Sequence, residues 1–359
     1  MDGINRHVLA ISQALNVLPD VEVGVVTLHP WGDVNDALKD AGVKCWSLGC
    51  VNGHQLKVIT RFCRVMREFR PEVVHDHVTA LFENVVLKWL YPKVRRVSTI
   101  HFISDPVTTL PVKQRVFNFL RIDRLCGFVA TSLPDACIYI SQGVRDAVGD
   151  SGVQTFVVYN PMSFTDVPRP IKKSKVRVIG TACRVESVKN PLAFTRVIGE
   201  VTKRLGNVEG WIIGEGSVLS DCKRLAAERG YDKILFMGRR NDAKQLIAQM
   251  DCFVMTSKRE GLPTALLEAM SLKTPIAFMD GEGGLHDLVK MDDDYGPFAI
   301  VCKAGDEASM IDGISSLLGD PKMSEEYAER AFEVGRKYFD LSSIAQQIRD
   351  VYEFSRGCT

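Results

Sequence analysis

The chain has 359 residues, of which 46% are hydrophobic and 25% are charged. This length predicts two domains, and the balanced composition excludes a disordered, collagen-like or low-complexity protein. Forty-five Lys and Arg stand against 44 Asp and Glu, a formal net charge of +1, so charge gives no reason to expect nucleic acid as a partner.

The cysteines and the apolar segments indicate in which compartment of the cell the protein resides. The 10 cysteines are scattered and form no Cys-x-x-Cys pair, which is typical of reduced cysteines in a cytoplasmic protein. No apolar run approaches the roughly 20 residues that span a bilayer, and the N-terminus lacks the apolar segment of a secretion signal. The sequence therefore predicts a cytoplasmic protein.

Short β-branched apolar runs alternate with amphipathic segments along the chain. This alternation predicts an α/β fold built from parallel sheets. A helix is expected over residues 8–16. In the first half we predict strands over residues 21–28, 72–77, 94–101, 128–131, 136–141 and 156–160.

The pattern is interrupted between residues 160 and 175 by prolines and lysines, as in an interdomain linker. We place the boundary near residue 170, which gives an N-terminal domain over 1–170 and a C-terminal domain over 171–359. The last amphipathic helix, 342–354, is expected to pack back on the first domain. In the second domain we predict strands over residues 176–181, 208–213, 234–237, 252–256, 275–279 and 298–302. Two such Rossmann-like domains would bind ligands in a cleft, at the carboxyl ends of their strands.

The N-terminus lacks the strand with which a doubly wound domain opens. Residues 2–7 already look like a loop that leads into a helix. In the 3-2-1-4-5-6 strand order the first strand lies at the centre, so its loss leaves two unpaired strand edges. We therefore expect about 5 to 15 further residues with an apolar strand upstream. Met1 is then an internal methionine or an artefact of how the chain is delimited.

Residues 257–270 carry the most informative pattern. Gly261 and Pro263 predict a tight turn after the strand at 252–256. The helix expected over 262–272 begins with free backbone N–H groups, which favour an anion such as a diphosphate. Glu260 in the loop and Glu268 on the helix have oxygens that accept hydrogen bonds from sugar or ribose hydroxyls.

This Glu-Gly-x-Pro turn, with a second Glu eight positions after the first and Ala-Met behind it, resembles the signature of family 4 glycosyltransferases. The resemblance implies the GT-B fold, a retaining mechanism and a nucleotide-sugar donor. It also implies that Glu260 contacts the donor sugar and Glu268 the ribose. The neighbouring residues assigned to donor binding are Gly261, Leu262, Pro263 and Thr264.

Other segments follow in the order of that family. Arg184 in a Gly-x-x-x-Arg loop and Lys189 before Asn-Pro resemble the two cations that neutralise the donor diphosphate as it leaves. No metal is expected, because no Asp-x-Asp stands where a metal-dependent transferase needs it. The remaining donor-binding assignments are Gly214 and Gly216 of a Gly-x-Gly turn, Met237 and Arg239 at a strand end, and Gly3 of an incomplete N-terminal glycine loop.

Histidines end two of the predicted strands. His101 resembles the family's histidine beside the reacting sugar, which makes it a candidate catalytic residue, and a buried structural histidine is the alternative. His75 and His77 fall on one face of a strand, which suits metal binding. Two ligands are too few for a metal site, so we expect a structural or acceptor-side role for this pair.

Residues 57–124 form a locally basic stretch, with 13 Lys and Arg against 6 Asp and Glu. Arg61, Arg64, Arg67 and Arg70 recur within it at helical spacing. The stretch is either a solvated helix face above a core stripe or a surface that docks on an anionic membrane.

Together these features predict a retaining, metal-independent glycosyltransferase of polysaccharide or lipopolysaccharide biosynthesis. It would move a hexose or acetamidohexose from a nucleoside diphosphate sugar, UDP being favoured over GDP, to a glycan or lipid-linked acceptor at the inner face of the cytoplasmic membrane. No cofactor is expected besides this co-substrate. A sugar-nucleotide epimerase of the same architecture and a non-catalytic sugar-binding paralogue stay open as alternatives. A nicotinamide dehydrogenase is disfavoured, because no complete Gly-x-Gly-x-x-Gly follows any predicted strand.

Overall fold

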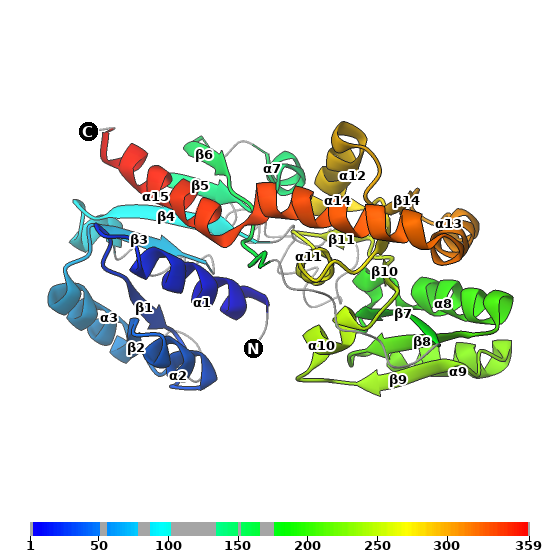
Figure 1. Cartoon of the computed structure of the whole chain (residues 1–359). Coiled ribbons are helices and arrows are strands. Elements are labelled where there is room, and N and C mark those ends of the chain that lie inside the picture. Colours follow the sequence, from blue (N-terminus) through cyan, green and yellow to red (C-terminus); the bar gives the residue numbers. More distant parts are fainter. Residues whose placement is uncertain are drawn as a thin grey trace. The chain divides into compact units, whose positions relative to one another are not determined.

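The computed structural model describes residues 3–50, 56–77, 87–101, 134–149, 152–165 and 176–357, and the chain divides into two compact units. The first unit combines Met1–Pro161 with Leu341–Thr359, and the second unit is Met162–Asp340. The chain thus leaves the first unit at Pro161, before the boundary expected near residue 170, and re-enters it at Leu341. Both units contain parallel sheets and helices, so the predicted α/β fold class is confirmed (Figure 1).

The second unit is built on a six-stranded sheet of order β14-β12-β10-β7-β8-β9 in which all neighbours are parallel. Its strands are β7 (Arg177–Ala182), β8 (Val208–Ile213), β9 (Ile234–Gly238), β10 (Cys252–Met255), β12 (Ile276–Met279) and β14 (Ile300–Cys302), with the two-residue strands β11 (Arg259–Glu260) and β13 (Glu282–Gly283) paired beside it. Its helices are η2 (Ser187–Lys189), α8 (Pro191–Leu205), α9 (Leu219–Arg229), α10 (Ala243–Ala248), α11 (Thr264–Ser271), α12 (Gly284–Tyr295), α13 (Glu307–Gly319) and α14 (Pro321–Phe339).

The central strands of this sheet are buried on both faces, as near-continuous apolar runs predict for a parallel sheet covered by helices. Phe253 of β10 and Phe278 of β12 are fully buried, and Ile314 of α13 packs in the core cluster with α8 and α9. All six strands predicted here are observed to within two residues at each end. Helix α11 begins at Thr264 and not at the expected residue 262, because Pro263 has ψ 81°, outside the helical region.

The described strands of the first unit form two parallel sheets. Strands β1 (Gly24–Thr27) and β2 (Lys44–Ser47) make one sheet, and the other has the order β3 (Val73–Asp76), β4 (Arg95–Ile100), β5 (Ala136–Tyr139), β6 (Gln154–Val157). The helices are α1 (Gly3–Asn16), α2 (Asp33–Asp40), α3 (Leu56–Phe69), α7 (Gln142–Val148) and α15 (Leu341–Gly357). Strand β2 was missed by the sequence analysis because its four residues include only two apolar ones. The strand predicted over 128–131 lies outside the described residues.

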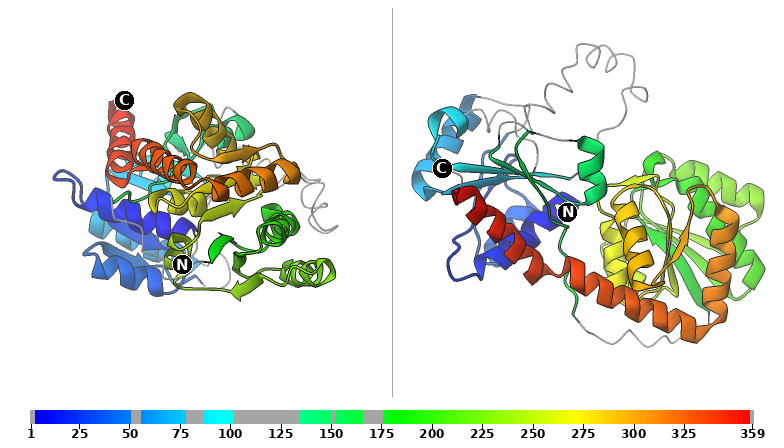
Figure 2. Two further views of the ribbon diagram at one scale, coloured as in Figure 1. Left: turned by 45° about the vertical axis from the view of Figure 1, so that its right-hand side comes forward. Right: turned by 90° about the horizontal axis from the view of Figure 1, so that it is seen from above.

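Two groups of helices pack on these sheets (Figure 2). In one core cluster, Ile11 of α1 and Ile348 of α15 join Val97 of β4. In another, α3 contacts both sheets through Val26 of β1 and Val74 of β3. Among the described residues no strand pairs with the second edge of β1 or of β3. The additional strand expected from the sequence stays a prediction.

Two further expectations concern cysteines and membrane spans. The described cysteines are free thiols, and most of them are buried. In the part of the chain that the structure describes, no helix has both the length and the apolar character needed to cross a bilayer.

Candidate donor site and histidine cluster

The loops that follow β7, β10 and β12 in the second unit are hydrogen-bonded to one another. Lys258 N–H donates to Val188 O at 2.9 Å and joins the loops after β10 and β7. Glu282 N–H donates to Lys258 O at 3.0 Å, and Gly284 N–H donates to Gly261 O at 3.2 Å, which adds the loop after β12. All three loops follow the carboxyl ends of parallel strands, where α/β sheets bind ligands.

Glu260 and Lys189 meet in this set of loops as an ion pair. Lys189 Nζ lies 2.6 Å from Oε1 and 2.6 Å from Oε2 of Glu260. Glu260 is fixed by the pairing of β11 with β13, and Lys189 is the last residue of η2. The side chain of Lys189 is only 18% exposed and that of Glu260 only 9%, so each charge depends on the other for compensation. Two predicted site residues, 71 positions apart, therefore form one cluster.

Arg184 lies in the loop after β7 with its side chain exposed to solvent. Beside it, hydrogen bonds from the Ser217 hydroxyl and N–H lower the pKa of Glu186, and the charge of Arg184 adds to this effect. Burial raises the pKa of the neighbouring Cys183 thiol to about 12. This thiol is therefore protonated at neutral pH and is no thiolate nucleophile.

Gly214 and Gly216 shape the same loop through close backbone contacts. A Cβ atom on Gly214 would lie 1.9 Å from Cys183 O, and one on Gly216 would lie 2.3 Å from Val185 O. Gly214 also has φ +135°, which side chains disfavour. The glycines are thus required by the packing of the turn after β8 against the loop that carries Arg184.

Met237 and Arg239 stand at the end of β9, the next strand of the sheet. Gly214 N–H donates to Gly238 O at 2.8 Å, so the turn after β8 is tied to this strand end. Met237 is partly buried and Arg239 is exposed. No contact of the described residues gives either side chain a role, and their assignment to base recognition stays a prediction.

Helix α11 starts directly after the Glu-Gly-Leu-Pro turn. Leu262 and Pro263 are buried, and no side chain caps the helix N-terminus. Glu268 is partly buried and lies four residues, about one helical turn, after Thr264. The turn and the helix thus put an uncapped helix N-terminus and the Glu260 carboxylate in adjacent positions of the chain.

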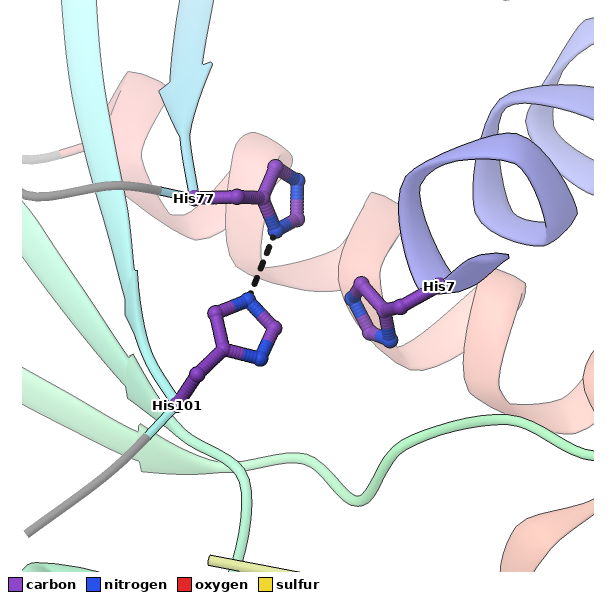
Figure 3. Close-up of side chains that lie close together, drawn as sticks. All are labelled: His7, His77 and His101. Carbon is purple, nitrogen blue, oxygen red and sulfur yellow. Dashed lines mark hydrogen bonds between the residues drawn. The ribbon is translucent and has the colours of Figure 1, made fainter. Parts of the chain in front are cut away.

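The first unit holds the other two predicted site residues. Gly3 is the first residue of α1, so residues 3–7 are helical where the sequence predicted a glycine loop, and His101 directly follows β4. Figure 3 shows His101 together with His7 of α1 and His77, which follows β3. His77 Nδ1 lies 3.2 Å from His101 Nε2, and the His7 ring centroid is 4.9 Å from that of His101.

His75 lies beside this cluster but has partners of its own. Its Nδ1 is 2.7 Å from the Tyr352 hydroxyl of α15, and its Nε2 is 2.6 Å from Thr99 Oγ1. Its ring centroid lies 4.2 Å from that of His77, on the same side of β3 as the period of two predicts. Burial lowers the pKa of His75 to about 3, so the ring is neutral at pH 7.

The sequence analysis grouped His75 with His77 and did not associate His7 or His101 with them. The three elements that carry His7, His77 and His101 are separate in the sequence, and only their packing brings the rings together. The one available signal was that both strand ends carry a histidine, which predicts neighbouring rings once β3 and β4 are known to pair.

Two family profiles cover most of the chain. The profile "Glycosyltransferase Family 4" matches residues 1–164, and "Glycosyl transferases group 1" matches residues 164–334. The chain is 22% identical over 315 residues to the N-acetyl-alpha-D-glucosaminyl L-malate synthase of Bacillus anthracis, a match that covers 83% of this chain and 79% of that protein. It is 25% identical over 353 residues, 96% of this chain and 93% of the other, to an alpha-1,4-N-acetyl-D-galactosaminyltransferase of Campylobacter jejuni that is named for a PP-undecaprenol-linked substrate.

Among solved structures, Anabaena HepE in complex with UDP matches with a TM-score of 0.78 at 17% identity, over 98% of this chain and 96% of that chain. At this identity the likeness shows the fold. The family matches agree with the Glu-Gly-x-Pro turn and with the order of the loops around it. The chain belongs to the family 4, or group 1, glycosyltransferases, a retaining family, and has their GT-B fold of two Rossmann-like domains.

Proposed function

We propose that this chain transfers a hexose or acetamidohexose from a UDP-sugar to a glycan or lipid-linked acceptor, with retention of the anomeric configuration. The observation that carries the proposal is the buried Lys189–Glu260 pair in the hydrogen-bonded loops of the second unit. The UDP complex of HepE supports a uridine diphosphate donor, and the PP-undecaprenol substrate of the Campylobacter jejuni relative supports a lipid-linked acceptor.

The donor diphosphate would be neutralised by Lys189 and Arg184. Because Lys189 is already paired with Glu260, a bound phosphate oxygen would replace one carboxylate oxygen at the ammonium group. Arg184 is exposed and supplies a planar guanidinium that suits two phosphate oxygens. The two cations stabilise the charge that develops on the diphosphate as its bond to the anomeric carbon breaks.

Release from Lys189 would leave Glu260 able to accept hydrogen bonds from hydroxyls of the donor sugar. Glu268 would accept hydrogen bonds from the ribose hydroxyls, and the neutral ring of His101 would contact the transferred sugar. In the transfer, the acceptor oxygen bonds to the anomeric carbon as the bond from that carbon to the phosphate oxygen breaks. The acceptor proton passes to the departing phosphate oxygen on the same face, which keeps the anomeric configuration.

The first experiment is a thermal-shift screen of UDP-, GDP- and ADP-sugars, followed by NMR of the first product formed from the best donor. We expect stabilisation by a UDP-sugar and a product with the donor's anomeric configuration, and Lys189→Met should abolish the transfer. An inverted product would contradict the mechanism. A donor epimerised in the absence of acceptor would indicate the epimerase, and donor binding without transfer or hydrolysis would indicate the non-catalytic paralogue.

The same assay tests whether transfer requires a divalent metal ion to neutralise the departing diphosphate. Turnover should be unchanged when Mg²⁺ and Mn²⁺ are omitted, because Arg184 and Lys189 take over the neutralisation of the diphosphate. An absolute requirement for either ion would contradict these roles.

We further propose that the face of the first unit around α3 docks on an anionic membrane, where a lipid-linked acceptor resides. Arg64 and Arg67 are exposed on α3. The segment that contributes Trp89 and Leu90, which are 80% and 61% exposed, is tied to α3 by a hydrogen bond from the Tyr91 hydroxyl to a backbone oxygen of the helix. A surface that combines an exposed Trp with cations is typical of proteins that insert into lipid headgroups.

Co-sedimentation with vesicles tests this surface. The chain should bind phosphatidylglycerol vesicles, should not bind phosphatidylcholine vesicles, and should dissociate as salt rises. Trp89→Ala and Arg64→Glu should weaken binding, whereas Arg145→Glu, an equivalent charge reversal on α7, should not. Equal binding to both vesicle types would contradict docking on an anionic membrane, and the cations of α3 would then form an ordinary solvated helix face.

A further inference from the structure

Three histidines from separate elements converge on one point of the first unit. Figure 3 shows the rings of His7, His77 and His101 directed toward one another. One ligand nitrogen of each ring lies within 4.8 Å of those of the other two. The ring centroids are separated by 5.1 Å, 4.9 Å and 5.4 Å, so the three rings are nearly equidistant.

These separations match a tetrahedral site with three imidazole ligands. With Zn–N bonds of about 2.0 to 2.1 Å, tetrahedral angles put ligand nitrogens about 3.3 Å apart and ring centres about 5 Å apart. The distance between His77 Nδ1 and His101 Nε2 is 3.2 Å, and the ion would replace the hydrogen bond that these two nitrogens make. The ligand nitrogen of His7 lies within 4.8 Å of those of His77 and His101.

The chemistry of the rings also suits a metal ion. His7 is 7% exposed, and neither of its ring nitrogens has a hydrogen-bond partner among the described residues. Buried polar atoms without a partner are rare and costly, so a ligand bound at this ring would remove a cost that the described residues leave. Burial lowers the pKa of His101 to about 4 and holds the pKa values of His7 and His77 well below 6.5. At neutral pH each ring is therefore uncharged and offers a lone pair.

We propose that His7, His77 and His101 bind one divalent transition-metal ion, with Zn²⁺ as the preferred ion and a water molecule in the fourth position. Three neutral imidazoles and no carboxylate favour Zn²⁺ over Mg²⁺ or Mn²⁺. The Lys189–Glu260 loops lie in the other unit. His101 is also the residue proposed to contact the transferred sugar; the ion would take its Nε2, which faces His77, and leave its Nδ1 for a sugar hydroxyl. The sequence analysis considered only His75 and His77 as metal ligands and expected no metal site, so this proposal departs from that expectation.

The ion would link α1 to the paired strands β3 and β4. His7 belongs to α1, whereas His77 and His101 follow the adjacent strands β3 and β4. His75 stays outside the site because Tyr352 and Thr99 occupy its two ring nitrogens. An ion that binds the folded state alone stabilises that state, so the first unit should gain stability as the metal concentration rises.

The experiment uses the whole chain, freed of metal with a chelator and then titrated with Zn²⁺ in a calorimeter and with Co²⁺ in a spectrophotometer. We expect one Zn²⁺ per chain, the intense visible absorption of tetrahedral Co²⁺, and a higher unfolding temperature with Zn²⁺. Mg²⁺ at the same concentration should produce none of these changes.

Substitutions identify the ligands. His7→Ala and His77→Gln should each weaken Zn²⁺ binding at least about 100-fold. His29→Ala and His286→Ala remove exposed histidines of the first and second unit and should leave the affinity unchanged. Circular dichroism of the metal-free variants checks the fold. If His7→Ala unfolds, His77→Gln still tests the ligand set, because His77 is partly exposed and its substitution disturbs the core less. The absence of Zn²⁺ binding by the parent chain, or equal affinity of the parent and His77→Gln, would overturn the proposal.

Discussion

Lys189 and Glu260 carry opposite charges in a part of the second unit that is mostly shielded from water. In the proposed reaction this pair has two roles, because each partner holds the other in place and both give up contacts when the donor binds. An ion pair of this kind stabilises a site mainly by preventing an uncompensated charge. The residues that we propose bind the donor thus also maintain the fold of the loops around them.

Glu260→Gln should lower the free energy of unfolding of the second unit by about 3 to 5 kcal/mol, because Lys189 keeps its charge without a counter-charge. The double variant Glu260→Gln with Lys189→Met removes both charges and should be more stable than the single variant. Urea denaturation measures both. The exposed pair Arg204–Asp312 is the control, since Asp312→Asn should change the stability by less than about 1 kcal/mol. Equal losses for the single and double variants would contradict the pairing.

Glu268→Ala should leave the fold intact and weaken donor binding, because it removes an acceptor for the ribose hydroxyls. The loss of a charge-assisted hydrogen bond, about 1.5 to 3 kcal/mol, corresponds to a Kd roughly 10 to 150 times higher. Titration calorimetry with the donor measures this change. Glu325→Ala, at an exposed position of α14, is the matched control. An unchanged donor affinity would remove Glu268 from the site.

At the scale of elements, the turn after β8 and the loop after β7 depend on each other's backbone. Val185 N–H donates to Glu215 O at 2.9 Å, and Val218 N–H donates to Val185 O at 3.1 Å. The position of Arg184 therefore depends on two glycines, Gly214 and Gly216, which pack against the backbone of its neighbours Cys183 and Val185. The strands position the loops, and the loops position the charges.

Gly216→Ala should lower the unfolding temperature and weaken donor binding together. The added Cβ would lie 2.3 Å from Val185 O and 2.5 Å from Val185 C, and backbone atoms of a paired loop have little room to move. Overpacking of this kind costs about 1 to 3 kcal/mol. Differential scanning fluorimetry with and without donor tests it. Gly319→Ala at the end of α13, where a Cβ would meet nothing within 4 Å, should have neither effect.

At the scale of the whole molecule, the end of the chain completes the first unit. Helix α15 contributes Ile344, Ile348 and Val351 to the core cluster that contains α1 and β4, and Tyr352 to the partners of His75. The stability of the first unit thus depends on residues that follow the entire second unit. The chain thus passes between the two units twice, and the core clusters of α15 and of the six-stranded sheet are separate.

Ile348→Ala should destabilise the first unit by about 2 to 5 kcal/mol, because it leaves a cavity at a site that is 2% exposed. Hydrogen exchange should increase in peptides of α1 and β4 and stay unchanged in those of β7 and β8. Gln347→Ala, at the exposed neighbouring position, is the control. Increased exchange spread evenly over both units would contradict separate cores.

Much of the second unit could be predicted from the sequence, because its strands are buried apolar runs and its site is a local pattern. Glu260, Gly261 and Pro263 are close in sequence, and their turn follows from residue chemistry alone. Strand β2 and the two-residue strands β11 and β13 could not be predicted, because such strands are too short to show an alternation of apolar and polar residues. The start of α11 was misplaced by two residues, because the ψ of Pro263 is set by its surroundings.

The sequence by itself determined the α/β class, the strands of the second unit, and the turn and helix that carry Glu260 and Glu268. These features depend on neighbours within a few residues, so local propensity and spacing encode them. The tertiary structure was needed to show that Lys189 pairs with Glu260 and that His7, His77 and His101 converge. It also placed α15, which the sequence predicted to pack on the first domain, in one core with α1 and β4. Each of those contacts joins segments that are distant in the chain, and packing of apolar faces, which many sequences satisfy, determines which distant segments meet.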